Sequence, residues 1–525
     1  MPDAAFADLP SAPALQEAEA LWLTRLFLPC DRIILTADSS AENRAWLAAR
    51  FPGRRIVTVS RAALLAHLRR RLAPALIEEA VYGLARRSPE LSASRVLTGG
   101  QRLLAVGLTA GALLFLWRDP SLLMRLVLAF LSIAFVASGL FRTALAFLSA
   151  PSAGDGPLPA DTALPRYTIL VPLYREAAVL PGLMAAMRAL DYPSAKLDIK
   201  LVVEADDAET YAAASALASG DSRFEIVPVP PGGPRTKPKA VNYALAFARG
   251  EYLVIYDAED RPEPDQLKKA VARFRGLPRA TACLQARLNF YNAEQNWLTK
   301  MFALDYAQWF DMLLPGLDRI GVPMPLGGTS NHFRTAVLRD IGGWDAFNVT
   351  EDADIGIRLS QLGYRVAMLD STTFEEAPVA AGAWLRQRSR WLKGYMQTWL
   401  VHMRDPLALI RRTGIWGFFA FQLFIGGGVI FALANPPLWI AFLAGLLFGW
   451  HAGAGAGASL FVNNLLLTYL AMMSPRRRGW EGLAPYGLTV VAYWAMVSVA
   501  GYRGLAQLVT RPFFWEKTMH GVTPQ

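Results

Sequence analysis

Residues 252–263 read Tyr-Leu-Val-Ile-Tyr-Asp-Ala-Glu-Asp-Arg-Pro-Glu, an apolar run that ends in three acidic side chains, Asp257, Glu259 and Asp260. A short apolar run bounded by turn signals is typical of a buried strand. In an open α/β sheet, ligands bind beyond the carboxyl ends of the strands. Carboxylates crowded there repel one another unless a cation joins them, and hard oxygen ligands suit Mg²⁺ or Mn²⁺. The stretch therefore predicts a metal site, with a solvated acidic turn as the alternative.

Strands and helices alternate on both sides of this stretch. Further apolar strands are expected at residues 167–173, 199–205, 224–229 and 283–289. Helical stretches are expected between and after them, at 177–190, 208–218, 240–248, 264–275 and 294–314. Strand alternating with helix predicts a parallel sheet built from βαβ units.

The composition places this α/β domain in a membrane protein. The 525 residues are 53% hydrophobic and only 18% charged, against about 25% charged in an ordinary soluble protein. The net charge of +10, without a lysine-rich tail, favours anionic lipid heads and a nucleotide as partners and no nucleic acid. The two cysteines, Cys30 and Cys283, are isolated, which excludes a disulfide framework. The acidic N-terminus lacks the features of a signal peptide, so we expect the chain to begin in the cytoplasm.

Apolar segments flank the α/β domain. Residues 101–117 and 122–150 predict a transmembrane hairpin, and residues 415–434, 438–450, 460–473 and 485–508 predict four further crossings. Four crossings return the tail to the cytoplasm but place Arg476, Arg477 and Arg478 outside, against the positive-inside tendency. The expected division is an N-terminal module (1–98), a transmembrane hairpin (99–150), a linker (151–164), the α/β domain (165–380), interfacial helices (381–412), about four transmembrane helices (413–510) and a cytoplasmic tail (511–525).

Four motifs follow one another in and after the α/β domain. They are Asp206-Asp207 after a strand, the acidic residues 257–260, Thr350-Glu351-Asp352, and Gln387-Arg-Ser-Arg390-Trp391. Any one is a weak signal. In this order, between membrane segments, they resemble the processive membrane-embedded family-2 glycosyltransferases, such as bacterial cellulose synthase and hyaluronan synthase, over about residues 165–399. The resemblance implies a GT-A (Rossmann-like) cytoplasmic domain inserted between α-helical transmembrane segments of a bacterial inner membrane, with a small α/β domain at the N-terminus.

The resemblance also assigns the donor site. Tyr174 and Glu176 match positions that hold the nucleoside, and Asp206 matches the aspartate that contacts uracil. Lys239 matches a lysine near the diphosphate, although Lys237 is an equally placed competitor. Asp257 is expected to face the ribose and the metal. The metal, Mg²⁺ or Mn²⁺, is expected on Glu259 with Asp257 or Asp260, because this chain has Glu where the family motif has its second Asp.

The later motifs are assigned to catalysis and to the acceptor. Asp352 resembles the general base, although an Asp before a helix is usually an N-cap. Gln387, Arg390 and Trp391 are expected to serve the diphosphate and the acceptor sugar, with interfacial anchoring as the alternative for Trp391. In the tail, Trp515, Lys517 and Thr518 resemble a gating loop over the nucleotide; the alternative is a frayed terminus.

These expectations describe an inverting enzyme that uses a UDP-sugar to extend a β-linked polysaccharide and to move it across the membrane. Its partners would be the UDP-sugar donor, the growing polysaccharide, membrane lipids and possible export or periplasmic proteins. Two alternatives stay open: transfer of one sugar to a lipid acceptor, and a non-catalytic nucleotide-sensing component of a secretion assembly. A hydrolase using paired carboxylates is a further option, which UDP should not inhibit.

Overall fold

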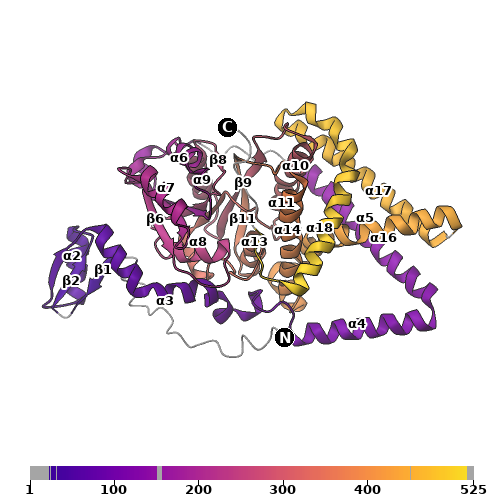
Figure 1. Ribbon diagram of the computed structural model, residues 1–525, viewed down its shortest axis with the longest axis horizontal. Coiled ribbons are helices and arrows are strands. Elements are labelled where there is room, and N and C mark those ends of the chain that lie inside the picture. The colour runs from indigo at the N-terminus through magenta and orange to yellow at the C-terminus, as the bar shows by residue number, and fades with distance from the viewer. Residues whose placement is uncertain (1–22, 24, 31, 150–156, 450, 517–525) are drawn as a thin grey trace.

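The computed structural model describes residues 23, 25–30, 32–149, 157–449 and 451–516 of the chain. Figure 1 shows a central sheet covered by helices, a small N-terminal module on one side, and long apolar helices that extend from the other side.

The acidic stretch begins in β7, which lies at the centre of an eight-stranded sheet in the order β6-β5-β4-β7-β10-β9-β11-β8. β7 pairs in parallel with β4, and β4 pairs in parallel with β5. The strands expected at 167–173 and 224–229 are confirmed, as are those near 199–205 and 283–289. The bounds are β4 Tyr167–Leu173, β5 Leu197–Glu204, β6 Phe224–Val229, β7 Tyr252–Ile255, β8 Arg261–Pro262, β9 Thr281–Phe290, β10 Asn331–Arg334 and β11 Arg365–Glu375.

The expectation of an all-parallel sheet is wrong in one half. The four-residue strand β10 inserts antiparallel between β7 and β9, and β8 pairs antiparallel with β11. The chain reaches β10 from the Gly327-Gly328 connection, so it enters the sheet from the end at which β7 leaves it. The sheet is therefore mixed, and the long strand β11, parallel to β9, was not predicted.

Helices bury both faces of the sheet. Leu183, Ala214 and Leu267 belong to a hydrophobic cluster on one face, formed with α6, α7 and α9. Val241, Leu314 and Ile355 belong to the cluster on the other face, formed with α8, α11 and α13. The bounds are α6 Leu180–Arg188, α7 Ala208–Ala218, α8 Lys237–Leu245, α9 Gln266–Gly276, α10 Trp297–Gln308, the π-helical η5 Trp309–Leu313, α11 Leu314–Ile320, α12 Thr335–Asp340 and α13 Glu351–Gln361, with the short 3-10 turns η3 Asp161–Ala163 and η4 Ser194–Lys196. This is the Rossmann-like α/β domain expected from the sequence.

The N-terminal module is a three-stranded sheet whose following helix reaches the central domain. Its elements are β1 Phe27–Pro29, β2 Ile33–Thr36, α2 Ala41–Arg50, β3 Arg55–Thr58, α3 Arg61–Arg87 and η2 Pro89–Leu91. Arg61 and Arg69 of α3 both pair with Glu225 on the edge strand β6. Asn242 of α8 donates to the Ala80 carbonyl over 3.0 Å. The module is therefore fastened to the sheet domain along the length of α3.

Among the residues that the structure describes, five helical runs are long and apolar enough to cross a membrane. They are made of α4 Gly99–Arg118, α5 Pro120–Leu148, the run α15 Pro406–Phe421, η6 Gln422–Gly426 and α16 Gly427–Phe448, then α17 His451–Met473 with η7 Ser474–Arg478, and η8 Glu481–Thr489 with α18 Val490–Thr510. The segments expected separately at 415–434 and 438–450 are one continuous helical run, since Pro436 and Pro437 lie inside α16. The C-terminal part thus has three such runs where four were expected.

These runs do not all point the same way. In Figure 1, α5, α16 and α17 extend away from the sheet domain, whereas α18 lies beside α14 (Ala381–His402) along that domain. Trp384 of α14 donates to the Tyr493 hydroxyl over 3.2 Å near the start of α18. Arg477, after α17, donates to the Ser149 carbonyl at the end of α5 over 3.1 Å. The arginines 476–478 therefore lie on the side of the helices that carries the sheet domain.

Candidate active site

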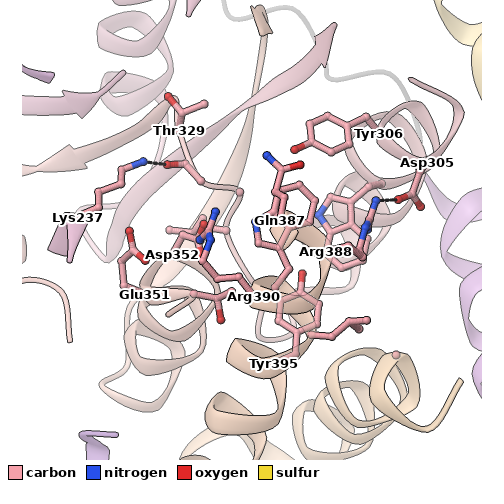
Figure 2. A pocket seen from close by; sticks show the side chains of 18 of the residues that line it. Lys237, Asp305, Tyr306, Thr329, Glu351, Asp352, Gln387, Arg388, Arg390 and Tyr395 are labelled. Atoms are coloured by element: carbon pink, nitrogen blue, oxygen red, sulfur yellow. Dashed lines mark hydrogen bonds and ion pairs between the residues drawn. The ribbon is translucent and has the colours of Figure 1, made fainter. Parts of the chain in front are cut away.

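A single cavity of about 820 Å³ joins the carboxyl ends of β4 and β7 to the apolar helices. Asp257 and Glu259 line it from the sheet, Asp352 from α13, and Arg390 from α14. Figure 2 shows Lys237, Glu351 and Asp352 on one side of Arg390, and Arg388 with Asp305 on the other. Residues of α5, α16, α17 and α18 complete the walls. The acidic stretch thus faces a chamber that reaches into the membrane helices.

The turn after β7 gives its three carboxylates different surroundings. Asp260 is buried and accepts hydrogen bonds from the Asp257 amide, over 2.8 Å, and from the Thr329 hydroxyl. It does not line the cavity. Asp257 pairs with Lys237, whose Nζ also donates to the Gly328 carbonyl over 2.7 Å. Glu259 lines the cavity directly. Asp260 therefore closes the turn, while its two neighbours face the chamber.

The carboxylates around this turn fit a divalent cation. Burial, and then repulsion from Asp257, raise the pKa of Glu259 and of Asp260 well above the usual range. Burial and the carboxylate of Asp260 raise the pKa of Glu375 in the same way. The buried Asp260 Oδ1 and Glu375 Oε1 accept no hydrogen bond from any described residue. Within the described residues no three side chains converge as a complete ligand set. Mg²⁺ usually takes one or two carboxylates together with substrate phosphates, and Asp257 with Glu259 meets that requirement.

Asp352 reaches the chamber from the first turn of α13. The N-cap of α13 is Thr350, whose side chain makes no capping hydrogen bond with the described residues. The alternative interpretation, in which Asp352 is the N-cap, is therefore wrong. Asp352 Oδ1 accepts from the Ala353 amide over 2.7 Å. A Cβ at Gly328 would lie 3.2 Å from its Oδ2, so this glycine allows the loop to approach the carboxylate closely. Burial raises the pKa of Asp352, which suits a general base.

Glu351, beside Asp352, carries a second perturbed carboxyl group. Burial, followed by the charge of Asp352, raises its pKa to about 8. Its buried Oε2 accepts no hydrogen bond. Lys237 and Arg390 act in the opposite direction and lower the Glu351 pKa. The group is therefore mostly protonated at pH 7 and does not compete with an anionic ligand for Arg390 or for Lys237, which stays paired with Asp257.

Helix α14 presents Gln387, Arg390 and Trp391 to the cavity, as the motif predicted. Arg390 Nη1 donates to the Val349 carbonyl over 3.2 Å, and its guanidinium lies 4.4 Å from the Trp515 ring centroid. Gln387 Oε1 is buried and accepts no hydrogen bond. The tail is docked on the same helix, because Lys393 donates to the Phe514 carbonyl over 2.8 Å.

Arg388 has a role that the sequence did not reveal. It donates to Asp305 over 2.7 Å and to the Tyr493 hydroxyl over 2.6 Å, which joins α14 to α10 and α18. Its guanidinium also lies 4.9 Å from the Trp391 ring centroid. Arg388 therefore positions the aromatic wall of the cavity, and its place inside the Gln-x-x-Arg-Trp motif was the only signal.

The structure brings most of the expected residues together and leaves some apart. Tyr174, Glu176 and Trp515 line the cavity, and Lys237 does so in place of Lys239. Lys239 is fully buried and pairs with Glu204 over 2.9 Å. Asp206 lies outside the cavity lining and pairs with Arg235 over 2.8 Å at the surface. Lys517 and Thr518 lie outside the described residues.

The comparisons with known proteins find glycosyltransferases. Residues 252–474 match the family model described as glycosyl transferase family group 2. The chain is 26% identical over 298 residues to a probable glycosyltransferase, YdaM, of Bacillus subtilis, covering 56% of this chain and 69% of that protein. It is 26% identical over 268 residues to a beta-monoglucosyldiacylglycerol synthase of Trichormus variabilis, covering 50% of this chain and 55% of that protein. The chain therefore spans about half the length of the latter relative.

Among solved structures, a mannosyltransferase from Pyrobaculum calidifontis in complex with GDP-Man and Mn²⁺ aligns with 73% of this chain and 98% of its own. The TM-score is 0.46 and the sequence identity is 19%.

Proposed function

We propose that this chain, a family-2 glycosyltransferase with a GT-A-like fold, transfers a hexose from a nucleoside diphosphate sugar to a lipid acceptor that reaches the site from the membrane. One observation carries the proposal: the cavity that holds the donor-side carboxylates is continuous with a chamber between α5, α16 and α17. An acceptor in that chamber and a nucleotide over the sheet would meet at Asp352.

The donor side of the cavity would supply positive charge that stabilises the departing diphosphate. Asp257 and Glu259 would hold a divalent cation, which when bound neutralises charge on the diphosphate oxygens. Lys237 and Arg390 line the same part of the cavity. Arg offers planar donors to phosphate oxygens, and such preorganised donors stabilise developing charge most effectively where water is excluded. Tyr174 and Glu176 line the cavity near the nucleoside expected there.

Asp352 is the proposed base. The acceptor hydroxyl forms the new bond to the anomeric carbon as the bond from that carbon to the phosphate oxygen breaks. The hydroxyl proton passes to the Asp352 carboxylate, and the nucleoside diphosphate leaves with the electron pair. A single base opposite the leaving group inverts the anomeric configuration. The raised pKa of Asp352 makes it a stronger base than an exposed aspartate.

The far half of the helical bundle favours a lipid acceptor over an extruded polymer. The cavity ends at Phe135 and Phe431, whose rings stack with centroids 5.2 Å apart. Beyond them a hydrophobic cluster fills the space between α5, α16 and α17; its buried members are Leu128, Phe135, Ala434, Leu438, Ala441, Ala456 and Leu460. A packed apolar core gives a sugar polymer no polar path. One relative is, by name, a synthase of a glucosylated diacylglycerol.

Extension of a polysaccharide remains a second candidate because of Trp391. This side chain lines the cavity, and Phe302 and Tyr306 lie beside it with ring centroids 5.7 Å and 6.2 Å away. Aromatic faces of this kind also suit the end sugar of a growing polymer, which is the role implied by the Gln-x-x-Arg-Trp motif.

The test is product analysis with the full chain in lipid vesicles. A panel of radiolabelled UDP- and GDP-sugars is supplied with Mg²⁺ or Mn²⁺, and products are divided into an organic phase and an insoluble polymer fraction. We expect label in the organic phase as a lipid that carries one sugar. Label only in polymer would support the second candidate. Asp352→Asn is the blank and should lose about 10²–10⁴-fold in kcat, while Asp340→Asn, an exposed acid outside the cavity, is the matched control.

If no sugar is transferred from any donor while the nucleotide still binds, the proposal that this chain is an enzyme fails, and the nucleotide-sensing alternative is supported.

A further inference from the structure

An arginine lines the membrane end of the cavity. Arg142 belongs to α5, six residues before the end of that helix at Leu148. At 1.5 Å per residue this places it about 9 Å from the helix end. Its guanidinium lies 5.3 Å from the Phe424 ring centroid, and a Cβ at Gly428 would lie 3.6 Å from its Nη2. The side chain therefore points between α5 and the η6–α16 run.

A second polar group, from α17, packs against the face of α5 that carries Arg142. Asn463 of α17 lines the cavity, is 1% exposed, and its Oδ1 accepts no hydrogen bond. That oxygen lies only 1.5 Å from where a Cβ at Gly139 would be, so Gly139 makes room for the amide. Residues three apart on a helix share a face, so Gly139 and Arg142 look toward the same chamber. Asn463 contributes a buried amide whose oxygen accepts no hydrogen bond from the described residues.

Arg142 has no direct ion-pair partner among the described residues, although the Asp305 carboxylate acts on its charge from beyond 4.0 Å. Within the described part of the chain, no carboxylate lies within ion-pair distance of its guanidinium. Asp305, which lines the same cavity, is paired with Arg388. Charged groups within membrane segments are costly, usually face a cavity or a partner, and mark ligand sites. The chamber therefore attracts an anion, and the guanidinium geometry suits a phosphate.

We propose that Arg142 binds the phosphodiester of a lipid whose headgroup carries free hydroxyls, that Asn463 accepts a hydrogen bond from that headgroup, and that the two residues so select an anionic glycerophospholipid over neutral diacylglycerol as the acceptor. This inference rests on the proposed function of transfer to a lipid. The phosphodiester is held at Arg142 without reacting, and Asn463 Oδ1 accepts from a headgroup hydroxyl. A second headgroup hydroxyl beyond it extends toward Asp352 and is the atom that is glycosylated.

The reaction itself is unchanged by this choice. The oxygen of the headgroup hydroxyl bonds to the anomeric carbon, its proton goes to Asp352, and the nucleoside diphosphate leaves. The phosphodiester stays intact, so the product is a glycosylated lipid that keeps one negative charge.

The experiment compares two acceptors in vesicles of phosphatidylcholine. One set contains phosphatidylglycerol and the other contains diacylglycerol, at equal mole fractions, with the labelled donor established in the product analysis. We expect wild-type protein to glycosylate phosphatidylglycerol. Arg142→Gln should raise the KM for this lipid by about tenfold or more, the value of one charge-assisted contact, with kcat and the donor KM little changed. Arg142→Lys should recover part of the loss.

Two controls separate a binding role from a structural one. Arg125→Gln removes an exposed arginine of the same helix that does not line the cavity, and it should leave both KM values unchanged. Release of nucleoside diphosphate to water, without acceptor, reports whether the donor site of each variant is folded. Water-soluble glycerophosphoglycerol, added as a competitor, shows whether the phosphodiester alone binds or the lipid tails are needed.

Any of four results would overturn the proposal. The first three are equal use of diacylglycerol and phosphatidylglycerol, an Arg142→Gln effect that is the same for both lipids, and an effect confined to the donor KM. Loss of donor turnover in Arg142→Gln together with Arg142→Lys would assign a structural role and also overturn it. If wild-type protein labels no lipid at all, the proposed function fails, which is a different outcome from transfer to the wrong lipid.

Discussion

Glu259 and Asp260 are neighbours in sequence, but the fold gives them different tasks. Asp260 is turned into the protein, where it accepts from the Asp257 amide and from the Thr329 hydroxyl. Glu259 faces the chamber. The sequence predicted an acidic cluster at the end of a strand and could not divide it, because the division depends on Thr329, which β10 brings from 69 residues away.

We expect Glu259→Gln to weaken metal-dependent transfer by about tenfold or more, since a neutral amide is a poorer ligand for a hard cation. Asp260→Asn should retain most of the activity because the amide oxygen can accept both existing hydrogen bonds. The measurement is the Mg²⁺ or Mn²⁺ concentration at half-maximal rate. If Asp260→Asn raised the metal concentration at half-maximal rate and Glu259→Gln did not, Asp260 would be the metal ligand.

Glu351 predicts a dependence on pH. Its pKa is raised to about 8, so the carboxyl is protonated at pH 7 and gains a negative charge as the pH rises through about 8. The charged form competes with the donor diphosphate for Lys237 and Arg390, and the donor KM should therefore rise above pH 8. Glu351→Gln imitates the protonated form and should keep the donor KM flat from pH 7 to pH 9. A steady-state pH profile of both proteins is the check, and parallel profiles would exclude this role for Glu351.

The four residues that the later motifs single out, Asp352, Gln387, Arg390 and Trp391, all line the cavity, and their roles stay predictions. The choice between Lys237 and Lys239 needed the structure, because side chains two apart on a helix point in different directions. His332 lies in the protein core: its Nδ1 forms a hydrogen bond of 2.7 Å with the Tyr167 hydroxyl, and burial lowers its pKa to about 3.

At the scale of elements, the seam between α14 and α18 positions the catalytic helix. The two helices make close contact along their length, from Trp384 with Tyr493 to Lys393 with Gly504. Gly504 allows this approach, because a Cβ there would lie 2.8 Å from the Ser389 carbonyl oxygen. The apolar sequence of α18 predicted a crossing, and its packing on α14 could not be read from hydropathy.

Gly504→Ala should therefore move α14 and with it Gln387 and Arg390. We expect a loss of about 1–3 kcal/mol in stability, the usual cost of overpacking, and a lower kcat. Thermal unfolding in detergent and the initial rate give both quantities. Gly482→Ala is the control, since a Cβ there meets nothing within 4 Å. An unchanged melting temperature in Gly504→Ala would mean that the α14–α18 contact accommodates the added methyl group without loss of stability.

Some strands of the sheet could be predicted from the sequence and others could not. Strands followed by helices were found nearly to the residue, as at β4 and β6. The strands β10 and β11 were missed because β10 has only four residues and β11, at Arg365–Glu375, begins and ends with charged residues. Pairing in the middle of a sheet, and not local periodicity, makes these segments strands.

For the whole molecule, the arrangement of the helices is compatible with a topology in which the conflict over Arg476, Arg477 and Arg478 does not arise. If α4, α5, the α15–α16 run and α17 cross the membrane while α18 lies along its surface, the chain crosses four times. The sheet domain, the arginines 476–478 and the tail then share one side, as the positive-inside tendency favours for a cytoplasmic domain. The N-terminal module, held to β6 through Glu225, lies on that side as well.

Cysteine labelling tests this topology. In a background without Cys30 and Cys283, we expect Arg476→Cys to react with a membrane-impermeant maleimide only after the cells are opened. Ser121→Cys, at the turn between α4 and α5, should react in intact cells. Reaction of Arg476→Cys in intact cells would restore the topology in which this segment is external.

The turns at the far end of the bundle have a consequence for everything outside the cell membrane. In the described chain, α4 passes to α5 through Asp119 alone, and α16 ends at a left-handed Gly449 just before α17 begins. If this end of the bundle faces outward, as in the topology tested above, a protein approaching from outside would meet only short connections between the described helices. Under the proposed transfer to a lipid, a protein that takes the product onward would then have to recognise the glycosylated lipid itself in the bilayer.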